Sequence, residues 1–352
     1  MRQVRFGVAF FLRDGIGKIV ERVRLVEELG YDSVWLAEAQ LLTPEMYTLL
    51  ATCAHNTRRI TIGPGVTTFV TRHPTITASG LAALAEIAPG RVGARFGFGG
   101  TSTHGVGLPA ARLEEYRNGF KLIARLLQGE TARINGLDVK LTWANPSLTR
   151  QVTLYSQIGS GPRSQRLAGE LGHPISLSLP LHEVPEALGR IGDGAEASGR
   201  SRSDIGISWW SNLSISHDWE AIKEHQLEMV ATRLRTDPVR FARGVSSEHP
   251  GADPGLVQRL SQAYDPLQHG DPRAAYAQML MDCPDDLWRG WLKGRLVGTL
   301  DEVAATLGQA LEHEEVFEVI VGPRQPTSRL SVEQILKTFA RAFLRENPTD
   351  KP

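Results

Sequence analysis

Residues 4–37 carry the pattern that decides the fold: VRFGVAFFLRDGIGKIVERVRLVEELGYDSVWLA. The apolar run Val4 to Phe10 is typical of a buried strand. A helix is predicted over Ile16 to Leu29, because its apolar residues recur every three or four positions, and Gly30 ends it. The run Ser33 to Ala37 predicts a second strand. A strand, a helix and a strand in this order favour two parallel strands joined by a right-handed crossover.

The alternation of apolar strands and amphipathic helices continues along the chain. Further strands are predicted at Arg59 to Ile62, Arg91 to Phe98, Thr153 to Ile158, Ile175 to Leu179, Ile205 to Ser211 and Phe317 to Val321. Helices are predicted between them, and the helix after the second strand is expected to start with Thr43 as its N-cap. Eight strands that alternate with helices favour a (β/α)8 TIM barrel of the α/β class over an open doubly wound sheet. No Gly-x-Gly-x-x-Gly follows the first strand, which further argues against a dinucleotide-binding sheet.

Two segments interrupt the alternation and are predicted to be insertions in a single barrel domain that spans residues 1–352. At about 128–150, the pair Asn135-Gly136 suits the type I′ turn of a β-hairpin. At about 217–294, helical stretches flank a loop that contains proline and glycine, and we expect a helical insertion or lid. The chain has 352 residues. A typical barrel has roughly 250, so there is room for both insertions.

The composition excludes several classes of protein. Lysine plus arginine and aspartate plus glutamate each number 39, so no net positive field favours nucleic acid or an anionic membrane. The two cysteines exclude a disulfide framework and a cysteine-based zinc site. There is no leader-like start and no run of roughly 18 apolar residues. We therefore expect no nucleic-acid or membrane partner and a cytoplasmic location.

Active sites of such barrels lie at the C-terminal ends of the strands, so the segments that follow the strands are the candidates. Glu38 directly follows the second strand and places a carboxylate at the rim, where a solvated or salt-bridged side chain is the alternative. After the third strand, the segment Gly63-Pro64-Gly65 allows the backbone to bulge toward a ligand. Arg72 and His73 come just before a helix, so they are candidates for a helix-capping cluster as well as for the site.

Two later loops are candidates for binding a cofactor. Gly99 and Gly100 begin a loop rich in hydroxyl groups, which suits contact with a flat ring or with polyol oxygens, although a plain turn has the same composition. It is no P-loop, because the Lys-Ser/Thr ending is missing. The turn Gly159-Ser160-Gly161 enters a helix with proline in its first turn, and free N–H groups there favour a phosphate. Arg163 either adds positive charge to this turn or points to solvent.

These segments together resemble the luciferase-like flavin oxidoreductases. The matching stretches are Leu29-Gly30-Tyr31-Asp32-Ser33-Val34-Trp35, Ile62-Gly63-Pro64-Gly65-Val66, Thr71-Arg72-His73-Pro74, Gly159-Ser160-Gly161-Pro162-Arg163 and Leu296 to Val303. They occur in the order and spacing of that superfamily. Within it, the chain is most similar to the branch named for methylenetetrahydromethanopterin reductase.

The resemblance implies a cofactor and its contacts. The branch uses the deazaflavin coenzyme F-420, a hydride carrier, whereas other branches use reduced FMN and oxygen. By position, the family's non-proline cis peptide behind the reactive face of the ring would be Gly65-Val66. The other contacts implied are phosphate contacts at Gly159, Ser160 and Gly161, with Arg163 beside them, and contacts to the ring or its side chain at Gly99, Gly100, Thr101 and Thr103. Relatives are often dimers, so a homodimer is expected by analogy.

Departures from the family pattern bear on the substrate. Relatives that oxidise a sugar phosphate carry a histidine directly after the acidic residue of the second strand, whereas Glu38 is followed by Ala39. Many reductases of the branch carry an acidic residue where this chain has Gly100 or Thr101. The substrate and its proton donor are therefore not defined by the family pattern.

Three functions are compatible with these observations. The first is an oxidoreductase that transfers a hydride between F-420 and a small organic substrate, with Glu38 or His73 orienting the substrate or moving a proton. The second is a two-component monooxygenase that uses reduced FMN and needs a flavin reductase as partner. The third is a non-catalytic barrel homologue that binds a partner.

Overall fold

The structure is a computed structural model that describes residues 4–11, 13–159, 161–236, 255–264, 273–323, 327 and 329–344. The chain separates into two compact units. The first unit comprises Met1–Ser211, Leu311–Gly322 and Phe339–Pro352, and the second comprises Asn212–Ala310 and Pro323–Thr338.

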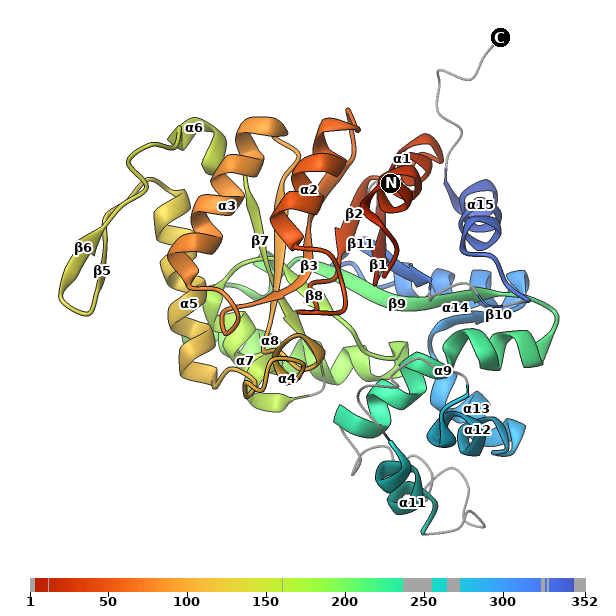
Figure 1. The fold of residues 1–352 in the computed structure, drawn as a ribbon. Coiled ribbons are helices and arrows are strands. Elements are labelled where there is room, and N and C mark those ends of the chain that lie inside the picture. The colour runs from red at the N-terminus through yellow and green to blue at the C-terminus, as the bar shows by residue number, and fades with distance from the viewer. Residues whose placement is uncertain are drawn as a thin grey trace. The chain divides into compact units, whose positions relative to one another are not determined.

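The first unit is built on a closed barrel of eight parallel strands surrounded by helices (Figure 1). Around the barrel, the strands are β1 (Arg5–Phe10), β2 (Ser33–Leu36), β3 (Thr61–Thr68), β4 (Gly93–Gly97), β7 (Thr153–Ile158), β8 (Ile175–Leu177), β9 (Ile207–Ile215) and β11 (Val316–Pro323). The barrel closes because β9 pairs with both β8 and β11, and β11 pairs with β1. The predicted (β/α)8 TIM barrel is therefore confirmed.

Helices follow the strands, and the longer ones bury an apolar face. They are α1 (Ile16–Glu28), α2 (Met46–His55), α3 (Pro74–Ile87), α4 (Thr101–His104), α5 (Leu113–Leu127), α6 (Pro146–Thr149), α7 (Pro162–Leu171), α8 (Val184–Ala197), α14 (Leu300–Leu311) and α15 (Val332–Phe343), with short 3-10 turns at Leu181–Glu183 and Arg202–Asp204. In α1, for example, Ile19, Val23 and Val26 are buried, as the spacing of three and four residues requires. The predicted hairpin is present between α5 and α6: β5 (Ala132–Ile134) and β6 (Leu137–Val139) pair antiparallel.

The strand β3 is longer than its sequence predicts. The predicted strand ends at Ile62, yet the observed one continues to Thr68 through two glycines and a proline, which normally end a strand. The reason is packing between backbones: a Cβ added at Gly63 would lie 1.7 Å from the carbonyl oxygen of Gly93 on β4. Glycine therefore allows β3 and β4 to approach at a distance that no other residue permits.

The barrel interior holds large side chains. Ala9, Trp35, Tyr155 and Ile320 form a buried cluster there. Room for the indole of Trp35 comes from a glycine on β4, because a Cβ at Gly93 would lie 2.8 Å from its ring. The barrel is thus a packed core rather than a pore.

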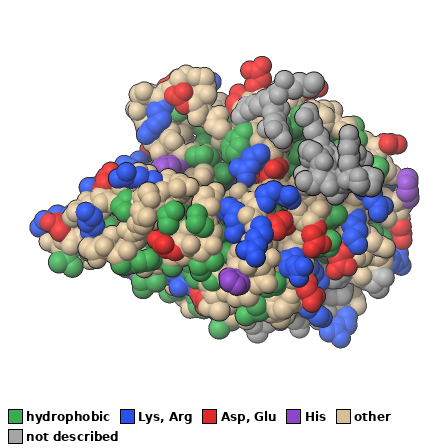
Figure 2. Space-filling model, turned by 90° about the horizontal axis from the view of Figure 1, so that it is seen from above, with side chains coloured by type: hydrophobic (Ala, Val, Ile, Leu, Met, Phe, Trp, Pro, Cys, Tyr) green, Lys and Arg blue, Asp and Glu red, His purple; other side chains and the backbone are tan. Residues whose placement is uncertain are grey.

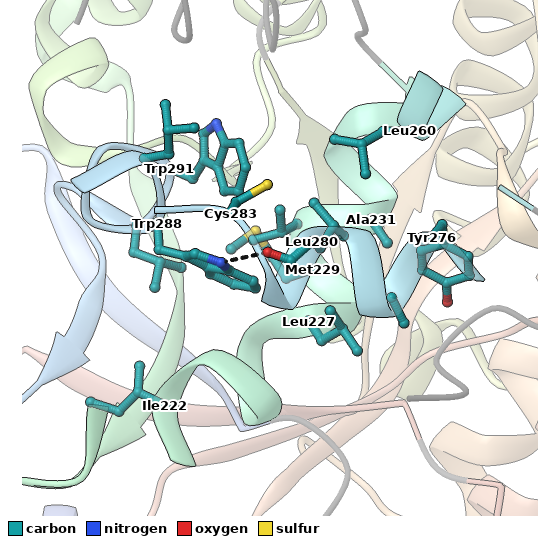
Figure 3. Close-up of a cluster of buried hydrophobic side chains, with 14 of the residues drawn as sticks. Ile222, Leu227, Met229, Ala231, Leu260, Tyr276, Leu280, Cys283, Trp288 and Trp291 are labelled. Carbon is teal, nitrogen blue, oxygen red and sulfur yellow. Dashed lines mark hydrogen bonds between the residues drawn. The ribbon is translucent and has the colours of Figure 1, made fainter. Parts of the chain in front are cut away.

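The second unit has its own hydrophobic core, shown in Figure 3. Besides most of α14 and the first part of α15, its described helices are α9 (Trp219–Thr236), α11 (Leu256–Ala263), α12 (Ala275–Met281) and α13 (Asp285–Leu292). The strand β10 (Leu296–Gly298) pairs parallel with the end of β9. Leu280 lies in this core, where its carbonyl accepts a 2.9 Å hydrogen bond from Trp288 Nε1. Much of the predicted helical insertion is thus helical, although residues 237–254 and 265–272 lie outside the described part. Its action as a lid stays a prediction.

The surface and the charged groups agree with the balanced composition. On the face drawn in Figure 2, acidic and basic side chains are interspersed. Among the described residues, no helix combines the length and the apolar character needed to cross a membrane. The same residues include no group of three or more histidine, cysteine, aspartate or glutamate side chains placed to hold a metal ion.

Candidate active site at the ends of the barrel strands

A backbone bulge in β3 is the centre of the candidate site. The register between β3 and β4 shifts between Gly65 and Thr67, and the peptide Gly65-Val66 is cis, as the resemblance to the family implied. Small residues make the bulge possible. A Cβ added at Gly65 would lie 2.6 Å from Trp35 Cβ, and one at Gly97 would lie 2.7 Å from Val66 Cγ1.

Glu38 is fixed against this bulge. Its backbone N–H donates to the carbonyl oxygen of Val66 at 3.2 Å, and its side chain is only 2% exposed. The hydroxyl of Thr67 donates a short hydrogen bond to Oε2, and Nε2 of Gln40 donates to Oε1 at 2.9 Å. Nη2 of Arg72 lies 3.6 Å from Oε1. A solvated rim carboxylate is therefore excluded, since Glu38 is buried among donors.

Arg72 joins Glu38 to a second carboxylate. Its Nη2 lies 2.7 Å from Oε1 of Glu45, and its guanidinium stacks 4.8 Å from the ring centre of Tyr47. Partial burial raises the pKa of Glu45, but hydrogen bonds from Thr48, Tyr47 and Arg72 outweigh it and lower the pKa overall. The pKa of Tyr47 is raised, chiefly by burial and then by the negative charge of Glu38. The hydroxyl of Tyr47 is therefore neutral at physiological pH.

His73 lies next to Arg72 but serves the helix. It is exposed, and its Nδ1 caps α3 by accepting the N–H of Thr75 at 3.3 Å, with the Thr75 hydroxyl at 2.7 Å. The helix-capping interpretation thus describes its observed contacts. Capping occupies Nδ1 and leaves Nε2 for any other partner, so a catalytic role of His73 stays a prediction.

The loop after β4 turns sharply at two glycines. Gly99 and Gly100 have φ values of 109° and 134°, which favour glycine. The hydroxyl of Thr103 accepts the N–H of Gly100 and donates to its carbonyl, both at 3.2 Å, and Thr103 is fully buried. Thr103 therefore closes the turn, whereas a Cβ added at Gly100 would meet no atom within 4 Å. Thr101 begins α4, and its side chain lies outside the described part of the structure.

The turn after β7 has the features of an anion site. Gly161 is the N-cap of α7 and has no side chain of its own to cap the first N–H groups of that helix. Gln165 Nε2 donates to the carbonyl of Gly159 at 2.8 Å, and the Ser164 hydroxyl donates to that of Gly161 at 2.7 Å, so both carbonyls are turned toward the helix. A Cβ at Gly159 would meet nothing within 4 Å. Arg163 is exposed in the first turn of the helix, and Ser160 lies outside the described residues.

Comparison with known proteins places the chain in a family. A family model described as luciferase-like monooxygenase matches residues 4–313. The chain belongs to this family. Among curated luciferase-like relatives, 5,10-methylenetetrahydromethanopterin reductase of Methanolobus tindarius is 27% identical over 338 residues, which cover 94% of this chain and 98% of the relative.

Solved structures of luciferase-like proteins share the barrel. The coenzyme F-420-dependent tetrahydromethanopterin reductase from Methanopyrus kandleri matches with a TM-score of 0.77 at 20% identity, covering 96% of this chain and 98% of that one. The oxygenating constituent of 3,6-diketocamphane monooxygenase from Pseudomonas putida, in complex with FMN, matches with a TM-score of 0.64 at 16% identity, covering 96% and 97%. The relatives of this luciferase-like protein thus include F-420-dependent oxidoreductases and flavin monooxygenases.

Several site residues were not predicted from the sequence. Thr67, Gln40 and Glu45 all contact Glu38 or Arg72, and none was a candidate. One signal was available for Thr67, which lies two residues beyond Gly65 in the segment predicted to bulge. The contact between Arg72 and Glu45 joins residues 27 positions apart, and no local pattern indicates it.

Proposed function

We propose that this luciferase-like protein is an oxidoreductase that transfers a hydride between coenzyme F-420 and a small organic substrate. The observation that carries the proposal is the buried Glu38 carboxylate, held by Thr67 and Arg72 against the β3 bulge at the C-terminal ends of the barrel strands. The full-length similarity to a methylenetetrahydromethanopterin reductase supports the choice of F-420.

The residues present fit the cofactor. The uncapped N-terminus of α7, at Gly161, offers N–H groups and a helix dipole to a phosphate. The open faces of Gly100 and Gly159 leave space at the two loops beside it. The bulge at Gly65 and Val66 would support the ring. When bound, F-420 supplies two-electron hydride transfer, and the protein supplies binding, orientation and the exclusion of water.

Glu38 acts on the substrate as an acceptor in this proposal. The hydroxyl, amide and guanidinium groups around it are all donors, so its two carboxyl oxygens act as acceptors. In this role Glu38 accepts a hydrogen bond from an N–H or O–H of the substrate, or takes its proton as the hydride leaves. Arg72 balances the charge of this buried carboxylate and fixes its orientation. A homodimer is proposed with this function, by analogy with relatives.

Titration of the apo protein with F-420 and with oxidised and reduced FMN, followed by fluorescence quenching, tests the cofactor. Micromolar binding of F-420 with weak FMN binding supports the proposal. Preference for reduced FMN would instead favour the two-component monooxygenase with a separate flavin reductase. Binding of neither would favour the non-catalytic homologue.

The variant Gly161→Asp tests the phosphate site. Aspartate is a good N-cap, so the fold should be retained while a carboxylate occupies the N–H groups and repels the phosphate. We expect cofactor affinity to fall about tenfold or more, which corresponds to about 1.4 kcal/mol. Gly189→Asp is the matched control, because it adds the same charge in α8 at a glycine with free space around it. Equal affinities of the two variants would show that the phosphate lies elsewhere.

A further inference from the structure

We propose that Arg95, in the centre of the barrel, is a positioning residue for the β3 bulge; the inference rests on the proposed function. Arg95 lies on β4 and is 0% exposed. Its guanidinium is stacked between two rings, 3.9 Å from the centre of Trp35 and 4.2 Å from that of Tyr155. Side chains from β2 and β7 thereby hold its plane in one orientation.

An ion pair and hydroxyl groups extend this contact to two further strands. Nη2 of Arg95 lies 2.5 Å from Oε2 of Glu318, which is also 0% exposed. Ser33 donates to Oε1 of Glu318 at 2.7 Å and Ser208 donates to Oε2 at 2.8 Å. Ser33 in turn accepts the indole N–H of Trp35 at 2.9 Å. The arrangement links β2, β4, β7, β9 and β11 across the barrel, so the guanidinium has little freedom to move.

The bulge rests on this layer. Gly65 is the residue of β3 that pairs with Arg95, and the register shifts directly after it. A Cβ added at Gly65 would lie 2.6 Å from Trp35 Cβ and 3.5 Å from Arg95 Cδ. Displacement of Arg95 would therefore displace Trp35 and Gly65 together. Glu38 would follow, because its N–H is bonded to the carbonyl of Val66.

Stability alone does not account for this ion pair. Nε and Nη1 of Arg95 have no hydrogen-bond partner among the described residues. Burial lowers the pKa of Arg95 and the charge of Glu318 opposes that effect, as expected for a charge removed from water. Apolar residues of similar volume often replace a buried ion pair without loss of stability. What they cannot supply is the fixed orientation between two rings that Arg95 has here.

The test compares Arg95→Met, Glu318→Gln and the double variant Arg95→Met/Glu318→Met with wild type. Arg91→Met is the matched control. Arg91 lies just before β4 and donates to Thr57 Oγ1 and to the carbonyl of Ile60, so it has contacts of its own. Four quantities are measured. They are the Tm, the amide hydrogen exchange of the peptides that contain Glu38 and Val66, and the Kd and the visible circular dichroism with F-420 and with reduced FMN.

We expect Arg95→Met to lower the Tm by several degrees, because it leaves Glu318 buried without its counterion. The double variant should regain most of the lost Tm, because it removes both charges. In the double variant, exchange at the Glu38 and Val66 peptides should still be about tenfold faster or more, since the bulge opens locally. Cofactor should bind about tenfold more weakly, with a changed dichroism spectrum. Glu318→Gln keeps the volume of the side chain and one acceptor oxygen but removes the negative charge. It should show the same local effects if the double variant does not fold. Arg91→Met should lower the Tm alone.

The outcomes separate the two proposals. The role of Arg95 would be overturned if Glu318→Gln and a folded double variant both showed the hydrogen exchange and circular dichroism of wild type. If wild type binds neither cofactor, the proposed function fails, and the exchange measurement alone still decides whether Arg95 positions the bulge.

Discussion

The hydrogen bond from Thr67 to Glu38 yields a prediction with a defined magnitude. Thr67 is 1% exposed and Glu38 is 5% exposed, so the bond is protected from water. A hydrogen bond to a charged group contributes about 1.5–3 kcal/mol. Valine has nearly the shape of threonine but lacks the donor, and it leaves a buried carboxylate oxygen short of one partner. Thr67→Val should therefore lower the free energy of unfolding by about 2 kcal/mol.

Urea denaturation of Thr67→Val, Glu38→Gln and the double variant forms a cycle that isolates this bond. The coupling free energy between the two positions should be about 1.5–3 kcal/mol. Thr77→Val is the matched control, because Thr77 is equally buried and its hydroxyl has no partner among the described residues. That variant should have wild-type stability or better. A Thr67→Val variant no less stable than Thr77→Val, or a coupling near zero, would refute the reasoning.

Two further predictions follow from the same region. Burial raises the pKa of Glu45, but the hydrogen bonds from Thr48 and Arg72 dominate and hold it below its ordinary value of 4.5. The ionised carboxylate therefore stabilises the fold above pH 4.5, and this stabilisation is lost as the pH falls through the lower pKa of the folded protein. The Tm values of wild type and Glu45→Gln should converge on acidification. Tm values that stay apart would show that the pKa of Glu45 is not lowered by folding. Gly97→Ala places a Cβ 2.7 Å from Val66 Cγ1 and should weaken cofactor binding, and Val66→Ala in the same chain should restore it. An unaffected Kd in Gly97→Ala, measured by fluorescence quenching, would show that the bulge can yield without cost.

The parts of the fold that depend on local sequence were predictable. The hairpin follows from Asn135-Gly136, which have φ values of 49° and 84° as a type I′ turn requires. The barrel follows from the repeated strand-helix pattern. The predicted start of α2 was wrong. Its N-cap is Glu45 rather than Thr43, and the Glu45 side chain accepts the N–H of Thr48 at 2.8 Å. Thr43 instead donates to the carbonyl of Ala39 at 3.1 Å.

The candidate site was predictable only in part. Glu38 and the bulge at Gly65-Val66 lie at strand ends, where the barrel itself directs attention. The partners of Glu38 were not predictable, because they come from other strands and loops and depend on how the barrel closes. Thr67 lies 29 positions away from Glu38, and Glu318 lies 223 positions away from Arg95. No periodicity or motif in the sequence connects such residues.

The pair Arg95–Glu318 also has a consequence for how the chain folds. Ser33 and Glu318, which share a hydrogen bond, are 285 positions apart, so nearly the whole polypeptide must be synthesised before this layer can form. Contacts of such separation form late, since a long loop must close first. Until then Arg95 is hydrated, and a strand paired one position out of register would turn its side chains to the opposite face and leave the charge without its counterion. The ion pair therefore stabilises the barrel only when β4 and β11 both lie in the correct register.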